Sequence, residues 1–278
     1  MFASVVLSAA LALFSVSPAA AAPLNITGAD IRAVAENIRS TFARGGPQWG
    51  VGSYVDNAAA LKWYTSDLTA GTAGVAGTTY TCYAGTVAGM PAHANWMNFN
   101  DMWARNKQIS LGNFDTAAQI TQIHDAIVTV SKESKVDARL ILAVIMQEST
   151  GNVNVPCTNG YNCGLMQANH GSVSYNSGNS AASILQMVRD GTEGTSQGPG
   201  YVQYLDGGSA YAYTNCPLNN PYGAARAYNT GSCATDKGLH CAKYGTPSYV
   251  NDIANRLVGW NGNGAPQGKC GFPAVGCT

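Results

Sequence analysis

One glutamate lies at the end of the most apolar segment of the chain. Glu148 follows the run Leu140–Met146 and Gln147, and no other Asp or Glu occurs between Ser149 and Arg189. Removal of water from around a carboxyl group raises its pKa, and the partial negative charge of a helix C-terminus raises it further. Such a group stays protonated near neutral pH and can donate its proton to a leaving oxygen atom. The sequence therefore predicts that Glu148 is a general acid.

Two short segments downstream accompany this acid. Gly164-Leu165-Met166-Gln167 begins sixteen residues after Glu148, and Ala227-Tyr228-Asn229-Thr230-Gly231 follows later in the chain. Together with Glu148-Ser149, and in this order, they resemble the soluble lytic transglycosylase and goose-type lysozyme family. Catalytic domains of that family carry Glu-Ser, Gly-Leu-Met-Gln and Ala-Tyr-Asn-x-Gly. The resemblance covers about residues 117–260, and the overall style is similar to secreted fungal members.

The resemblance implies a role for each matched residue. Glu148 would protonate the glycosidic oxygen, and Ser149 would bind substrate or hold the surroundings of the carboxylate. Gly164 would let the backbone approach the sugar, because a side chain there would block the groove. The remaining substrate-binding residues would be Leu165, Met166, Gln167, Tyr228 and Asn229.

Some of these residues have a more specific expected part. Met166 and Gln167 would line the cleft, where the Gln167 amide can both donate to and accept from an N-acetyl group. Tyr228 would reach Glu148 with its hydroxyl, and Asn229 would orient the sugar or the carboxylate. Leu165 and Met166 are also ordinary core residues, so a purely structural role stays open for both.

Three further side chains are judged by position alone and not by a motif. Tyr161 and Tyr175 are interpreted as platforms on which a sugar ring could stack. His170 lies three residues after Gln167. It is interpreted as a loop histidine satisfied by hydrogen bonds rather than as a catalytic base.

A second catalytic carboxylate is not evident from the sequence. Goose-type lysozymes place Asp residues between the catalytic Glu and the Gly-Leu-Met-Gln segment, but Ser149–Cys163 contains no Asp or Glu. Asp190 and Glu193 are interpreted as solvated residues at the end of a separate helix. Hydrolysis by two carboxylates needs a second group across the sugar. We therefore expect a single-carboxylate mechanism, in which Glu148 acts first as an acid and then as a base on water or on the C6 hydroxyl of the sugar.

The resemblance implies a secreted, monomeric enzyme that cleaves the β-1,4 bond between N-acetylmuramic acid and N-acetylglucosamine in peptidoglycan strands, with no metal or other cofactor. Two alternatives stay open. The same site could cleave chitin or chitooligosaccharides, or the chain could be a glycan-binding protein of the same fold without turnover. Fifteen basic and fifteen acidic residues cancel, so the basic surface of a nucleic-acid-binding protein is not expected.

Composition and the N-terminus indicate an extracellular protein. Charged residues form 11% of the chain, well below the usual quarter, which predicts a neutral, hydrogen-bonding surface suited to carbohydrate. Residues 1–22 join an apolar run to Ala19–Ala22 and predict a cleaved signal peptide. The run is short for a membrane anchor, so no membrane association is expected after cleavage. Asn25-Ile26-Thr27 is a glycosylation sequon.

The cysteines also favour an oxidising compartment. Their even number predicts four disulfides, whose pairing the sequence leaves open. Their spacing does not fit a zinc site. The eight cysteines are Cys82, Cys157, Cys163, Cys216, Cys233, Cys241, Cys270 and Cys277.

Helical periodicity dominates the elements that must position these residues. We expect a mainly α fold of the α+β, lysozyme-like kind, with a catalytic domain over residues 95–262, an N-terminal extension over 23–94 and a Gly- and Pro-rich tail over 263–278. The extension is expected to be mostly loops, with one hairpin near Thr78–Val87. Helices are expected over 31–42, over 96–106, after a cap at Asp115 or Thr116, over 138–149 after a cap at Asp137, over 180–190 with a stop at Gly191, over 221–229 and over 247–260.

Overall fold

The computed structural model describes residues 50–74, 79–109, 111–234, 238–242, 245–262 and 270. The predicted signal peptide, the sequon at Asn25, the helix over 31–42 and all of the tail except Cys270 lie outside these residues. Gly46–Thr278 forms one compact unit. The described part of the extension belongs to this unit together with the helices that follow, and the expected domain boundary near residue 94 stays a prediction.

The described part of the chain is mainly helical, as the sequence predicted. Its α-helices are α3 (Phe99–Ile109), α4 (Ala117–Ser134), α5 (Ala138–Glu148), α6 (Ser180–Glu193), α7 (Tyr201–Asp206), α8 (Pro221–Thr230) and α9 (Tyr249–Leu257). Short 3-10 helices occupy Ala60–Trp63, Val87–Gly89, His93–Asn95, Leu111–Asn113, Ser177–Asn179 and Ser209–Thr214. β structure within the described ranges is limited to isolated bridges. None of the described helices is long and apolar enough to cross a membrane.

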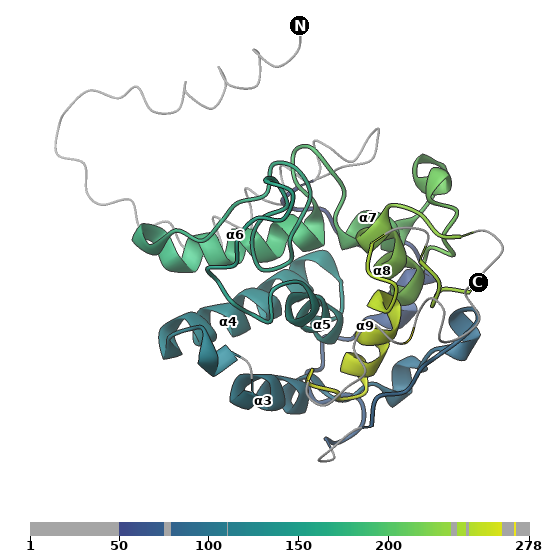
Figure 1. The fold of residues 1–278 in the computed structure, drawn as a ribbon, viewed down its shortest axis with the longest axis horizontal. Coiled ribbons are helices and arrows are strands. Elements are labelled where there is room, and N and C mark those ends of the chain that lie inside the picture. The colour runs from purple at the N-terminus through teal and green to yellow at the C-terminus, as the bar shows by residue number, and fades with distance from the viewer. Residues whose placement is uncertain are drawn as a thin grey trace, which may run out of the picture. The chain divides into compact units, whose positions relative to one another are not determined.

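Helix α5 lies at the centre of the unit and carries Glu148 at its last position. Every residue from Ala138 to Met146 is buried, which agrees with a helix that is apolar on all sides. Figure 1 shows α5 between α4 and α9, and both of these helices pack against it, as does α3. Because α5 is packed on all sides, the position of Glu148 at its C-terminal end is fixed relative to the surrounding helices.

The helix ends follow local sequence in most cases. Asp137 caps α5, because its Oδ1 accepts from the backbone N–H of Arg139 at 3.0 Å. Thr116 rather than Asp115 caps α4, with a capping box to Gln119. Gly151 has a φ of +82° shortly after α5, a conformation that suits glycine at a helix end.

The predicted stop of α6 at Gly191 is wrong, because the helix continues to Glu193. A Cβ atom at Gly191 would lie 2.4 Å from the Cβ of Met166. The glycine is therefore needed for close packing between α6 and the segment that contains Met166, and not for a turn. Sequence alone does not distinguish these two reasons for a glycine near a helix end.

The predicted hairpin near Thr78–Val87 is also wrong, since residues 79–87 contain no strand. Their backbone bonds instead to side chains of α9. The N–H of Thr81 donates to Asn255 Oδ1 at 2.8 Å, the N–H of Tyr83 donates to Asn251 Oδ1 at 2.6 Å, and Asn255 Nδ2 donates to the carbonyl of Thr81 at 2.7 Å. Two asparagines thus replace the partner strand.

Disulfides confirm part of the cysteine prediction. Cys82 pairs with Cys270, Cys157 with Cys163, and Cys216 with Cys233. Cys241 is also disulfide-bonded, and Cys277 lies outside the described residues. The bridge from Cys82 spans 188 positions and holds the extension next to the C-terminal part of the chain.

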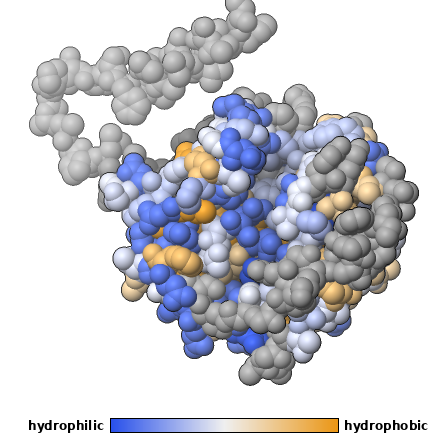
Figure 2. Space-filling view, viewed as in Figure 1, coloured by the Kyte–Doolittle hydropathy of each residue, from blue (hydrophilic) through white to orange (hydrophobic). Residues whose placement is uncertain are grey.

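The surface seen in Figure 2 is mostly hydrophilic or intermediate in hydropathy, and hydrophobic side chains occur there in small separate areas. Because charged residues form only 11% of the chain, much of this polar surface is uncharged.

Candidate active site

Glu148 is a half-buried carboxyl group at the C-terminal end of α5. Burial raises its pKa from 4.5 to about 7, although the hydrogen bond from Tyr249 acts in the opposite direction. The Tyr249 hydroxyl donates to Oε1 at 2.6 Å. Near neutral pH a substantial fraction of this group is protonated, so the side chain can act as a proton donor. The sequence predicts desolvation as the main cause of the raised pKa, and burial is the larger of the two effects on this carboxyl group.

The sequence predicts no role for Tyr249 beyond its place in an expected helix over 247–260. The sequence instead expected the Tyr228 hydroxyl to reach Glu148. That expectation is wrong, because Tyr228 donates to the carbonyl of Met166 at 2.8 Å. Tyr249 bonds to Glu148 in place of Tyr228 because α9 packs directly against α5. No local sequence pattern predicts this contact.

Ser149 connects the acid to the Gly-Leu-Met-Gln segment. Its Oγ lies 2.8 Å from the carbonyl oxygen of Leu165 and 3.0 Å from that of Ile145, and it accepts from the N–H of Gly151 at 3.2 Å. The side chain is buried. Of the two expected roles, holding the surroundings of the carboxylate describes these contacts, since the hydroxyl is already engaged within the protein.

The Gly164–Gln167 segment turns back on itself beside Ser149. Gly164 has a φ of +76°, and a Cβ atom there would lie 2.7 Å from both Met187 Cγ and the carbonyl oxygen of Val173. The missing side chain therefore makes room for the protein's own residues, and the expected approach of a sugar to this backbone stays a prediction. Leu165 and Met166 are fully buried, so their side chains form core rather than a cleft wall.

Two amide side chains expected to bind sugar are held by the protein itself. Gln167 accepts from the N–H of Thr158 at 3.0 Å and donates to the carbonyl of Gly164 at 3.0 Å. Asn229 accepts from the N–H of Thr246 at 3.1 Å. Both amides therefore help to hold loops of the protein, and their binding of sugar stays a prediction.

The interpretation of Asp190 and Glu193 as solvated residues is wrong. Both are buried. Asp190 accepts from the N–H of Val173 at 2.8 Å and from Gln186 Nε2 at 2.7 Å, and Glu193 accepts from the N–H of Gly52 at 2.7 Å. Each carboxylate is thus committed to holding a loop, which leaves neither placed at the surface to act across a bound sugar.

One of the two proposed stacking platforms is available at the surface. Tyr161 is exposed, and its ring stacks on that of His170 with 3.6 Å between centroids and 13° between planes. The ring of His170 makes this stack, while its backbone N–H donates to Asn169 Oδ1 at 2.7 Å and its backbone carbonyl accepts from the Thr195 hydroxyl. Tyr175 instead links helices, since its hydroxyl bonds to Gln119 at 2.9 Å and to Ser180 at 3.1 Å.

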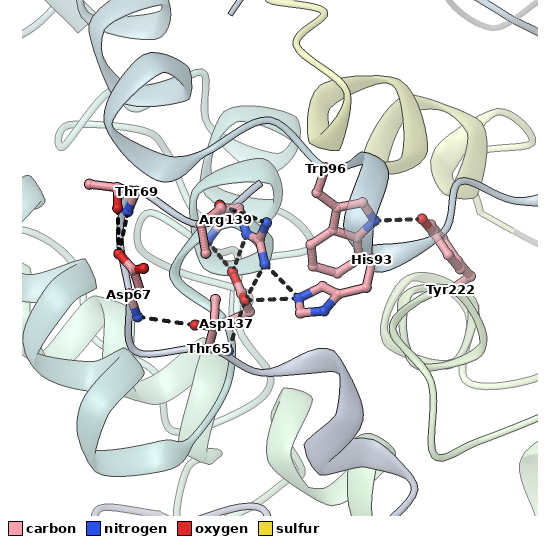
Figure 3. A network of polar contacts seen from close by, with 9 residues as sticks. Thr65, Asp67, Thr69, His93, Trp96, Asp137, Arg139 and Tyr222 are labelled. Carbon is pink, nitrogen blue, oxygen red and sulfur yellow. Dashed lines mark hydrogen bonds and ion pairs between the residues drawn. The ribbon is translucent and has the colours of Figure 1, made fainter. Parts of the chain in front are cut away.

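A buried ionic network holds the other end of α5. Arg139 Nε and Nη2 each donate to a different oxygen of Asp137 at 2.8 Å, and His93 Nε2 lies 3.3 Å from Asp137 Oδ2. Figure 3 shows this group beside Trp96, whose indole N–H donates to the hydroxyl of Tyr222 at 3.0 Å. Residues of the extension thereby secure the N-terminus of the helix that carries Glu148.

Within the described ranges, no group of three His, Cys, Asp or Glu residues is arranged to hold a metal ion. Comparison of the chain with protein-family models, curated proteins and solved structures gives no match.

Proposed function

We propose that this protein is a secreted, lysozyme-like glycosidase that cleaves the β-1,4 bond between N-acetylmuramic acid and N-acetylglucosamine in peptidoglycan. The observation that carries the proposal is Glu148 itself. It combines a pKa of about 7 with a partly exposed side chain and a phenol bonded to one of its oxygens. Disulfides within a mainly helical body agree with a secreted protein.

In the proposed reaction, protonated Glu148 transfers its proton to the glycosidic oxygen while the bond from that oxygen to the anomeric carbon breaks. The carboxylate that remains accepts the hydrogen bond from Tyr249. It then takes a proton from an attacking hydroxyl, which is either water or the C6 hydroxyl of the same sugar. The acetamido group of the substrate can assist as an internal nucleophile between the two steps.

A single-acid mechanism is supported by what the other carboxylates do. Asp190 and Glu193 are buried and bonded to loop backbone, and Asp115 accepts from the N–H of Val153 at 3.1 Å while it is itself buried. Because these three carboxylates are already bound to backbone groups of the protein, the proposal favours a single acid over the double-displacement route of two-carboxylate glycosidases.

The test uses the purified protein and its Glu148→Gln variant on purified peptidoglycan, with products weighed by mass spectrometry. Cleavage by the wild type and its loss in the variant are expected. Products lighter by one water than hydrolytic muropeptides would identify transglycosylation. A parallel digestion of chitin tests the other polymer, and equal inactivity of both proteins on every glycan would refute the proposal.

A further inference from the structure

Tyr201, the first residue of α7, has a buried hydroxyl group that forms no hydrogen bond with any residue that the structure describes. The side chain is 1% exposed. Buried hydroxyl groups are nearly always paired, so an exception calls for a functional or structural explanation. Among the described residues, no contact of Tyr201 accounts for its hydroxyl group.

The position of Tyr201 supplies an explanation. Its ring lies 4.8 Å from that of Tyr228, centroid to centroid. Tyr228 in turn bonds to the carbonyl of Met166, next to Leu165, which Ser149 holds beside Glu148. Tyr201 thus packs against Tyr228, and both tyrosines lie close enough to Glu148 for its charge to act on them. Burial and then the charge of Glu148 raise the pKa of Tyr201 well above its usual value.

We propose that Tyr201 is a second hydrogen-bond donor for Glu148, and that its hydroxyl engages the carboxylate, directly or through one water molecule, once Glu148 has lost its proton. In this arrangement Tyr249 donates a hydrogen bond to Glu148 in both of its protonation states, whereas Tyr201 donates one only to the ionised carboxylate. Tyr201 is a positioning residue, and its part in turnover rests on the proposed glycosidase function.

The charged and titratable groups near Glu148 are consistent with these separate roles for Tyr249 and Tyr201. Tyr249 from α9 and Tyr228 from α8 both carry raised pKa values, caused by burial and then by the charge of Glu148. Arg226 from α8 lowers the pKa of Tyr201, and Asp190 from α6 raises that of Tyr228. Of the three phenols, Tyr249 is bonded to Glu148 and Tyr228 to a carbonyl, so Tyr201 has the hydroxyl still available.

The test compares Tyr201→Phe with the control Tyr204→Phe. Both tyrosines lie on α7 and are buried, but Tyr204 faces Tyr211, with 5.7 Å between ring centroids, and Glu148 is not among the groups that shift its pKa. The pKa of Glu148 is measured by NMR titration of protein labelled with carboxyl-13C glutamate. The chain contains four Glu, and the spectrum of Glu148→Gln identifies the signal.

Loss of a donor to the charged form should raise the pKa of Glu148 in Tyr201→Phe, with an acid dissociation constant about tenfold lower. The control should leave the pKa unchanged. An unchanged pKa in Tyr201→Phe, with near-UV circular dichroism equal to wild type, would overturn the inference, as would an equal shift in both variants.

The two proposals can fail separately. If the wild type cleaves no glycan but Tyr201→Phe shifts the pKa, the glycosidase function fails and the hydrogen bond stands. If the wild type cleaves peptidoglycan but the pKa of Glu148 is unchanged in Tyr201→Phe, the glycosidase function stands and the proposed hydrogen bond from Tyr201 fails. With both intact, the high-pH limb of kcat/KM in Tyr201→Phe should move upward together with the pKa.

Discussion

The hydroxyl of Tyr249 donates a 2.6 Å hydrogen bond to Oε1 of Glu148, a residue 101 positions earlier in the chain. This bond lowers the pKa of Glu148 and partly opposes the effect of burial. A carboxyl group with a pKa near 7 is suited to both halves of a reaction in which it first gives a proton and then takes one. The bond therefore sets the protonation balance of the proposed acid.

Tyr249→Phe should raise the pKa of Glu148 and move the high-pH limb of kcat/KM upward by about one pH unit, because a donor to the charged form is lost. The measurement is a pH profile on soluble peptidoglycan fragments.

Tyr222→Phe is the matched control, since Tyr222 is also fully buried and its hydroxyl donates to the carbonyl of Pro91 at 2.6 Å, away from Glu148. It should lower stability without moving the profile. An identical shift in both variants would contradict the role given to Tyr249.

Glu148→Gln should stabilise the protein at neutral pH. Burial raises the folded-state pKa from 4.5 to about 7, so the folded state holds the proton more tightly than the unfolded chain. The stability from this group is fully present below pH 4.5 and is lost as pH rises through about 7, by about 3 kcal/mol. Urea unfolding at several pH values should show the advantage of the variant growing over this window.

Glu133→Gln provides the comparison, because Glu133 forms a partly exposed ion pair with Arg189 at 2.9 Å. Its loss should cost less than about 1 kcal/mol. If the advantage of Glu148→Gln did not change with pH, the raised pKa would be refuted.

Ser149→Ala should destabilise the fold by about 1–3 kcal/mol, because the buried N–H of Gly151 loses its acceptor and the carbonyl of Leu165 loses its donor. Activity should fall as well, since the Gly164–Gln167 segment is no longer fastened beside Glu148. Chemical unfolding measures the first effect. Thr121→Ala, which removes an exposed bond to the carbonyl of Ala117, should change stability by less than about 0.5 kcal/mol.

Gly191→Ala should destabilise, although alanine normally favours a helix interior over glycine by about 1 kcal/mol. The new Cβ atom would lie 2.4 Å from Met166 Cβ, and overpacking of this kind costs about 1–3 kcal/mol. Gly112→Ala, where the nearest atom would be 3.5 Å away, should be close to neutral. The measurement is thermal unfolding. Equal unfolding temperatures for the two variants would contradict the prediction, because they would show that Met166 moves aside without cost.

Asp137→Ala should cost about 3–5 kcal/mol at neutral pH, because it leaves the buried Arg139 guanidinium without its partner. Replacing Arg139 by Met in the same chain should recover much of this loss. Burial alone would raise the pKa of Asp137, but the hydrogen bonds from Arg139 and His93 hold it below its usual value. The stability from this group is therefore present above about pH 4 and lost as pH falls further, so acid titration of unfolding should bring variant and wild type together.

Local sequence determined the elements that depend on short-range chemistry. The apolar run of α5, its cap at Asp137 and the left-handed glycine at Gly151 could all be read directly, because caps and periodicity act within one or two turns. The desolvation of Glu148 also followed, since an acid that ends a buried helix cannot avoid low-polarity surroundings.

Only the tertiary structure decided which groups meet the acid. Tyr249 bonds to it through the packing of α9 against α5, and Asn251 and Asn255 take the place of a predicted hairpin partner. Such contacts join residues separated by a hundred positions or more, so no periodicity or spacing records them. Gly191 shows the same limit, because the atom that requires a glycine there belongs to Met166, and nothing local in the sequence brings those two residues together.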